Sequence, residues 1–373
     1  MLFRSVTGAV FFQHASGSFL CISAGATILA AGGTSGIFAR RLTSGDVPSS
    51  VHGIALEAGC TLINIEFMQM MPGLVSPAYG VVFNEKTFRY ARFGKQASDI
   101  TPRDPQALSA LLEMRSSHGP FTARLDDEAV DLAIDVAGAN GLPLTLAFPE
   151  HNAPEFVQTF ANWLKAEYGI DPSDTLHVAM FAHASNGGIR ICPDTSTGVP
   201  GLFACGELTG GMHGADRIGG LSSANGLVFG RVAGMEAATF ARAHARGLAQ
   251  THMTGAPLDL PSALRPDVTA LCDSQAEKLT EQLRMTMSTY AMINRTETGL
   301  TSALRTVDEL ESELCQPGNA GPGTSPAPRE LMNGIRLRSQ LALARTMLEA
   351  MRARRQSLGS HFRADYPTPH PQA

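Results

Sequence analysis

The sequence predicts an α/β fold that carries an inserted α+β lobe and ends in a helical region. Two short apolar runs, Ala26–Ala31 and Gly201–Cys205, lack polar alternation, as is typical of strands buried on both faces. Both runs lead directly into glycine motifs. From Pro266 onward, apolar stripes of helical period predict long packed helices.

The chain before the first apolar run predicts a β-hairpin. Residues Ser5–Phe12 and Phe19–Ser23 form two apolar strands, and His14–Ser18 supplies a polar turn between them. Because this turn interrupts the apolar stretch, the hairpin is favoured over a secretory signal peptide. After the first run, the pattern predicts a helix over Ser50–Gly59 and a short strand over Thr61–Glu66.

Proline-rich joints and helical patterns alternate between Gln69 and about Leu176, which predicts the inserted lobe. Its helices are expected over Pro105–Arg115, Asp127–Asn140 and Pro154–Tyr168. Glycine dominates the chain before Gly220, and a helix is expected from Ser222 to about Arg246. The C-terminal helices are expected over Ala276–Tyr290, Thr298–Leu314 and Leu331–Arg355, with a loop over Gln316–Arg329.

Charge and cysteine usage exclude several classes of protein. With 29 Lys and Arg against 34 Asp and Glu, the net charge of −5 lacks the basic character of a nucleic-acid binder. The six cysteines form no Cys-x-x-Cys pair, so we expect no metal site and interpret them as reduced thiols of a cytoplasmic protein. No apolar run reaches about 18 residues, so we expect no integral membrane segment.

Candidate functional residues concentrate between Ala182 and Gly234. The pair Gly187-Gly188 permits a close approach of the backbone to a ligand. The second apolar run ends at Gly206 and Glu207, and ligands of α/β proteins bind at the carboxyl ends of strands. Farther along, Gly219-Gly220 and Ser222-Ser223 open a helix whose free N–H groups attract an anion. His213 and Arg217 lie between these motifs, flanked by glycines.

These motifs resemble the flavoprotein subunit family of succinate dehydrogenase, fumarate reductase and L-aspartate oxidase. His183-Ala-Ser-Asn-Gly-Gly-Ile189 is similar to the family's His-x-x-x-Gly-Gly-Ile, and Gly201-Leu-Phe-Ala-Cys-Gly-Glu207 to its Gly-Leu-(Phe/Tyr)-Ala-x-Gly-Glu. His213-Gly-Ala-Asp-Arg-Ile-Gly219 is similar to its His-Gly-Ala-Asn-Arg-Leu-Gly. The resemblance covers nearly the whole chain, with further matches at Ile28–Gly33, Glu66–Pro72, Thr101–Asp104 and Ser357–Pro367.

The resemblance implies an FAD-dependent oxidoreductase that transfers hydride between the flavin and a small (di)carboxylate. In the family, an arginine of the capping domain moves the proton, and Arg103 occupies that motif position. His183, His213 and Arg217 would hold the substrate, with Arg217 as a bidentate clamp for a carboxylate. The residues expected to contact FAD are Ala31, Gly32, Gly33, Gly188, Gly206, Glu207, Gly220, Ser222 and Ser223.

The resemblance also implies a domain arrangement. A Rossmann-like FAD-binding domain is expected in two parts, residues 1–68 and 183–247, around an α+β capping domain at residues 69–182. A helical domain is expected at residues 248–373. Because the family brings both glycine motifs to the same flavin, we expect the two apolar runs in one sheet although about 170 residues separate them.

The sequence departs from the family pattern at several points. It contains no Gly-x-Gly-x-x-Gly turn after a strand, so we expect a truncated FAD-binding domain and weak FAD binding by the chain alone. Met71 replaces a histidine, Ser49-Ser50-Val51 replaces Gly-Asp-Gly, and Leu358 replaces an arginine.

Two alternatives stay open. One is a non-catalytic or split-subunit remnant that needs another polypeptide for the missing half of the FAD site. The other is an enzyme similar to L-aspartate oxidase. A redox partner subunit is expected as well, and the protein is either cytoplasmic or attached to a membrane through that subunit.

Overall fold

The computed structural model describes residues 5–94, 104–149, 153–171, 173–244, 270–315 and 326–366. Arg103, the predicted proton-moving residue, lies outside these ranges. Most of the predicted loop over Gln316–Arg329 also lies outside them.

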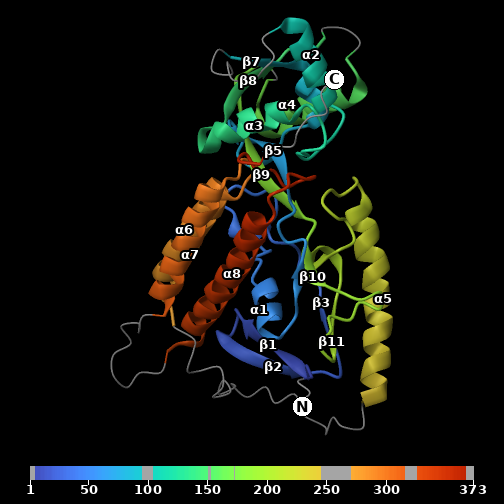
Figure 1. Ribbon diagram of the computed structural model, residues 1–373, viewed down its shortest axis with the longest axis vertical. Coiled ribbons are helices and arrows are strands. Elements are labelled where there is room, and N and C mark those ends of the chain that lie inside the picture. The colour runs from blue at the N-terminus through green and yellow to red at the C-terminus, as the bar shows by residue number, and fades with distance from the viewer. Residues whose placement is uncertain are drawn as a thin grey trace.

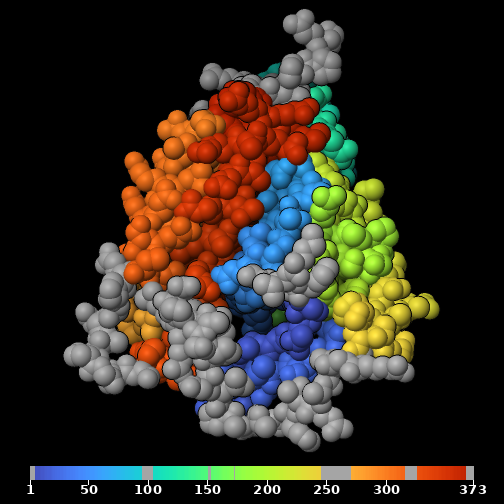
Figure 2. All heavy atoms as spheres, turned by 60° about the horizontal axis from the view of Figure 1, so that its bottom comes forward, coloured from blue at the N-terminus to red at the C-terminus, as the bar shows by residue number. Residues whose placement is uncertain are grey.

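The predicted N-terminal hairpin is confirmed. Strand β1 (Gly8–Gln13) pairs antiparallel with β2 (Ser18–Ser23), and Phe12 lies opposite Phe19. The two rings meet edge to face with their centroids 5.5 Å apart. Helix α5 spans Leu221–His244. In the view of Figure 2, the blue hairpin lies between the C-terminal helices, in orange and red, and α5, in yellow.

The two apolar runs lie in one sheet, as expected. Strand β3 (Thr27–Leu29) pairs in parallel with β11 (Leu202–Ala204), and Ile28 lies opposite Phe203. The expectation that both strands are buried on both faces is wrong for β3, because Ile28 is 40% exposed whereas β11 is buried throughout. In the described chain β11 is the only strand paired with β3, so the other edge of β3 has no strand beside it.

A second small sheet contains three strands. Helix α1 (Val51–Glu57) leads to β4 (Leu62–Ile63), which pairs with β10 (Gly188–Arg190), and β10 pairs in parallel with β12 (Thr209–Gly210). This confirms, in shortened form, the helix and strand predicted between Ser50 and Glu66. The sheet joins chain from both sides of the inserted lobe, so it fixes the two ends of that lobe relative to each other.

The inserted lobe, called the upper lobe below, is built on a five-stranded sheet (Figure 1). The strand order is β6 (Val81–Val82), β5 (Met68–Ser76), β9 (Leu176–Ser185), β8 (Leu142–Leu146) and β7 (Ala91–Phe93). Its helices are α2 (Pro105–Arg115), α3 (Glu128–Val136) and α4 (Glu155–Tyr168), close to the predicted ranges. Strands β5 and β9 extend downward from this lobe toward the small sheets, so residues at their lower ends lie between the two parts of the molecule.

The C-terminal region is helical, as predicted. Its helices are α6 (Asp273–Tyr290), α7 (Glu297–Leu314) and α8 (Pro328–Ala353). Figure 1 shows them on the opposite side of the small sheets from α5. The main hydrophobic core runs without a break from Leu74 and Phe121 of the upper lobe to Leu283 and Met347 of these helices. In the described part of the chain, no helix is long and apolar enough to cross a membrane.

Candidate functional site

The carboxyl ends of β3 and β11 bring Gly33 against Glu207. A Cβ atom on Gly33 would overlap the Glu207 carboxylate in its present position, so the glycine lets this side chain lie directly against the backbone. Glu207 Oε1 accepts a hydrogen bond from the backbone N–H of Ser185 at 2.9 Å. Ser185 Oγ in turn lies 2.8 Å from the backbone N of Thr34 and 2.7 Å from its hydroxyl. The parallel pairing of two strands that are distant in the sequence therefore places Glu207, Ser185 and Thr34 in one hydrogen-bonded cluster at the strand ends.

Burial governs the charge of Glu207. Desolvation raises the pKa of its carboxyl group, and the Ser185 N–H and the charge of Arg217 oppose that rise. Among the described residues only its Oε1 is engaged in a hydrogen bond. The second oxygen is thus available to accept a hydrogen bond from a ligand hydroxyl.

Arg217 is held in place by side chains from two different elements. Its Nε donates to Gln69 Oε1 at 3.0 Å, and its Nη1 donates to Ser222 Oγ at 3.2 Å. Gln69 Nε2 also donates to the Arg217 carbonyl at 3.4 Å. Gln69 is fully buried in β5, and Ser222 lies at the start of α5. The guanidinium group is therefore oriented between the upper lobe and the helix that follows the glycine-rich loop.

Two histidines lie within the electrostatic reach of Arg217. Burial lowers the pKa of His183, on β9, and of His213, and the charge of Arg217 lowers both further. His213 Nε2 lies 3.3 Å from Asn225 Nδ2, so this ring nitrogen accepts a hydrogen bond and the other can donate one. Near neutral pH the group combines one cation with two uncharged imidazoles, which is an arrangement suited to a small carboxylate.

His183, His213 and Glu207 therefore all lie within the electrostatic range of Arg217. The sequence analysis did not select Gln69 or Asn225. Gln69 could have been found from the sequence, because it lies inside the Glu66–Pro72 motif that resembles the family. Asn225 lies in the predicted helix, where no sequence pattern distinguishes it. His183, His213, Arg217, Gln69, Asn225 and Ser222 are together called the Arg217 group below.

The glycines predicted to contact FAD fall into two classes. Gly188 is buried in β10, where a Cβ atom would overlap the Leu208 carbonyl, so it serves close packing of the sheet. Gly206 and Gly220 have φ angles of +71° and +81°, and a Cβ atom there would meet nothing within 4 Å. Gly32, with φ of +80°, and the exposed Ala31 continue this edge on the β3 side. Ser222 and Ser223 are exposed at the first turn of α5.

The Ser49-Ser50-Val51 segment has a different role from the one that the resemblance suggests for this position. Ser49 Oγ donates to the Gly33 carbonyl at 2.8 Å and accepts from the Gly36 N–H at 2.9 Å. Its backbone adopts a φ of +61°. Ser49 therefore stabilises the turn that places Gly33 beside Glu207.

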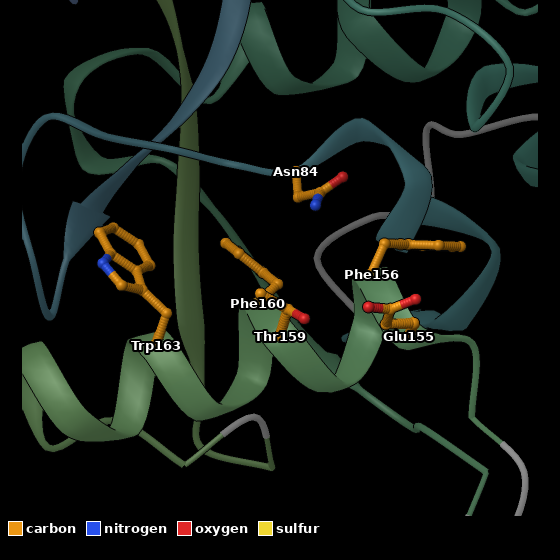
Figure 3. Close-up of a pocket in the computed structure, with 6 residues that line it drawn as sticks. All are labelled: Asn84, Glu155, Phe156, Thr159, Phe160 and Trp163. Atoms are coloured by element: carbon orange, nitrogen blue, oxygen red, sulfur yellow. The ribbon is translucent and has the colours of Figure 1, made fainter.

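A separate pocket of about 600 Å³ lies on the upper lobe, away from the Arg217 group (Figure 3). Phe160 and Trp163 of α4 line it with their rings stacked, centroids 6.3 Å apart, and Glu155 lies at the other end. None of the predicted site residues lines this pocket. Within the described ranges, no group of three or more His, Cys, Asp or Glu residues could hold a metal ion.

Comparisons with known proteins identify the family of the chain. The family model described as "FAD binding domain" matches residues 3–223, more than half of the chain, and "Fumarate reductase flavoprotein C-term" matches residues 280–372. An uncharacterized FAD-dependent oxidoreductase of Methanocaldococcus jannaschii is 29% identical over 96% of this chain and 64% of its own length. L-aspartate oxidase of Caulobacter vibrioides is 28% identical over 95% of this chain and 60% of its own.

A solved structure shows the same architecture. The Sdh1 complex of Mycobacterium smegmatis with UQ1 includes a chain that is 26% identical, with a TM-score of 0.76 over 97% of this chain and 60% of that one. The chain thus spans less than two thirds of the length of the relatives that it matches. With both family models matched, one of them over most of the sheets that carry the site, the chain belongs to the FAD-binding flavoprotein family that includes the fumarate reductase flavoproteins.

Proposed function

We propose that this chain forms the substrate site and one side of the flavin site of an FAD-dependent oxidoreductase acting on a small (di)carboxylate. The observation that carries the proposal is the Arg217 group, in which one oriented guanidinium lies among two uncharged imidazoles. The Arg217 group lies next to the carboxyl ends of β3 and β11. Ala31, Gly32 and Gly206 at these ends, together with Gly220 just before α5, are called the glycine edge.

The residues of this edge fit part of an FAD molecule. Open space lies beside Gly206 and Gly220, and the free N–H groups at the start of α5 suit a phosphate or another electron-rich group. Glu207 offers an oxygen to a sugar hydroxyl. Ala31, Gly32, Gly33, Ser222 and Ser223 complete the residues that would line the cofactor, while Gly188 supports them from the sheet.

In the proposed reaction, the Arg217 group binds and orients the substrate. The guanidinium pairs with one carboxylate, and His183 and His213 donate hydrogen bonds to the other carboxylate or to a carbonyl. Bound FAD supplies the acceptor or donor of the hydride. We assign the movement of the proton to Arg103, which requires partners that pass the proton on because the ordinary pKa of arginine lies far above neutrality.

The substrate class includes amino dicarboxylates. An arginine and two neutral imidazoles recognise the carboxylates but do not select the substituents on the carbon atoms between them. An activity similar to that of L-aspartate oxidase therefore fits the same residues. A redox partner subunit is part of the proposal, because electrons taken from the substrate must leave the flavin.

A second candidate function has one observation in its favour. Helix α5 and the loop before it expose large apolar residues, with Leu227 76% exposed, Ile218 70% and Val228 57%. Exposed apolar clusters favour contact with another protein surface. In this alternative the chain is a subunit that completes its flavin site only together with a second polypeptide.

The proposed function is tested with FAD titration and with turnover. Isothermal titration of FAD into the 373-residue chain is expected to show weak binding, since the sequence contains no Gly-x-Gly-x-x-Gly turn. Turnover is then measured at saturating FAD with fumarate, succinate and L-aspartate, using artificial electron donors and acceptors. Tight stoichiometric binding of FAD would show that the remaining motifs suffice.

The decisive variant is Arg217→Ala. It should lower kcat/KM by roughly 30-fold or more, because losing one partner of a desolvated charge contact costs on the order of 2–5 kcal/mol. Arg305→Gln is the matched control, since Arg305 is exposed on α7 and its one ion pair within the described ranges is with Glu309, 4.0 Å away. Equal losses in the two variants, or none in Arg217→Ala, would refute the assignment.

A further inference from the structure

The residues just before Arg217 are held by chain segments from other parts of the molecule. Three donors converge on the Asp216 carboxylate, all at Oδ2. Thr122 Oγ1 lies 2.7 Å away, Arg124 Nε 2.9 Å and Arg124 Nη2 2.8 Å. Thr122 and Arg124 belong to the upper lobe, whereas Asp216 belongs to the loop that leads into α5. The contact therefore ties the upper lobe to the backbone that carries Arg217.

The carbonyl of Ala215 is held in a comparable way from the C-terminal tail. Both the backbone N and Oγ of Ser360 lie 3.0 Å from it, and Asn186 Nδ2 lies 3.3 Å away. A Cβ atom on Gly359 would overlap the Ala215 carbonyl, and Gly359 has a φ of +55°. The tail thus approaches the loop as closely as a glycine allows.

A third contact closes the arrangement. The backbone N–H of Ala123 donates to the Gly359 carbonyl at 2.7 Å. The segment at residues 122–124, the loop at 215–217 and the tail at 359–360 are therefore bonded to one another in a ring. A displacement of the upper-lobe segment must break one of these bonds or move the loop with it.

Charge gives Asp216 a specific role in this ring. The similar family motif has asparagine at this position, and an amide cannot form the ion pair with Arg124. An unpaired carboxylate next to Arg217 would also weaken the attraction of that guanidinium for an anion. Pairing with Arg124 neutralises it, and the bond from the buried Thr122 fixes its position.

We propose that Asp216 is a positioning residue that couples the upper lobe to the anion-binding pose of Arg217. The inference rests on the proposed function, because it concerns how the same site holds a dicarboxylate. It predicts that the affinity for the anion depends on Arg124, although Arg124 is on a different lobe and the structure shows no contact between its side chain and Arg217.

The test uses malonate as the probe and the full chain without added FAD. Isothermal titration compares wild type with Asp216→Asn, Arg124→Gln and the double variant. Each single variant should weaken malonate binding roughly three- to tenfold, and the double variant should lose no more than the larger single loss. The loss from Arg124→Gln should shrink at high salt, since the Arg124 side chain is 63% exposed. Arg305→Gln should bind malonate as wild type does.

Hydrogen exchange supplies a second readout that does not need an anion. Exchange at the Ala123 amide and across residues 213–219 should be faster in Asp216→Asn than in wild type or Arg305→Gln. The proposed coupling would be overturned if exchange were unchanged in Asp216→Asn, or if every variant bound malonate as tightly as wild type. It would also be overturned if the losses in the two single variants added up in the double variant. If wild type binds no malonate but Asp216→Asn speeds exchange, the ring exists and it is the proposed function that fails.

Discussion

The Arg217 group and the glycine edge beside it are built in opposite ways. Arg217 is hydrogen-bonded to a buried glutamine of β5 and to a serine of α5, and the two residues before it are tied to the upper lobe and to the tail. On the cofactor side, open space lies beside Gly206, Gly219 and Gly220, and the first turn of α5 is exposed. The substrate side is therefore organised within this chain, whereas the cofactor side presents a surface.

This difference suggests which changes alter the fold and which alter only binding. Substitutions on the organised side should disturb packing and hydrogen bonds made across three regions of the chain. Substitutions on the open edge should leave stability nearly unchanged. The following predictions compare the two sides directly.

The largest effect is expected from Gly359→Ala, in the tail that holds the loop before Arg217. The added Cβ overlaps the backbone carbonyl of Ala215, and Gly359 has a φ of +55°, so relief requires a shift of the tail or of the loop, at a cost of about 1–3 kcal/mol in the free energy of unfolding. Gly219→Ala is the matched change on the open edge, where a Cβ meets nothing within 4 Å, and it should leave stability within about 0.5 kcal/mol of wild type. Urea unfolding measures both, and a similar cost in the two variants would remove the distinction.

A pH-dependent effect is expected from the tail that holds the loop. His361 Nδ1 accepts a hydrogen bond from Arg295 Nη1 at 2.6 Å, and its Nε2 donates to the Arg354 carbonyl at 3.0 Å. Burial, followed by the charge of Arg295, lowers the pKa of His361 to about 3. The unfolded chain, with an ordinary histidine pKa near 6.5, then binds more protons below pH 6.5, so the folded state loses stability as the pH falls.

His361→Gln tests this sign. Glutamine can accept and donate at similar places but does not titrate, so the variant should lack this contribution. Between pH 6.5 and 5 the free energy of unfolding should fall by about 2 kcal/mol more in wild type than in the variant. Urea unfolding at four or five pH values gives both slopes, and parallel slopes would show that His361 is already free to titrate in the folded protein.

Local pattern in the sequence predicted the elements, and the resemblance to the flavoprotein family predicted how some of them pair. The continuous apolar runs indicated the strands β3 and β11, and the resemblance placed them in one sheet, which brings Gly33 next to Glu207. The spacing of His213 and Arg217 placed both on one loop. His183 was assigned by a motif more than 25 residues earlier, and the structure brings it within the electrostatic reach of Arg217.

The sequence could not predict contacts that depend on how distant segments pack. In the sequence, Gln69 is one polar residue among apolar neighbours. Its hydrogen bond with Arg217 depends on the position of β5 in the folded chain. The three donors around the Ala215 carbonyl come from residues 186 and 360, far apart in the chain. The exposure of Ile28 depends on what lies beside β3, which an apolar run alone does not show.

The most direct test of the account is a crystal structure of the chain with malonate. If the Arg217 group binds the substrate, one carboxylate of malonate should lie within hydrogen-bond distance of the Arg217 guanidinium and the other within reach of His183 or His213, with Asp216 still paired to Arg124. Malonate bound elsewhere, with Arg217 turned away from it, would contradict the assignment of the Arg217 group as the substrate site.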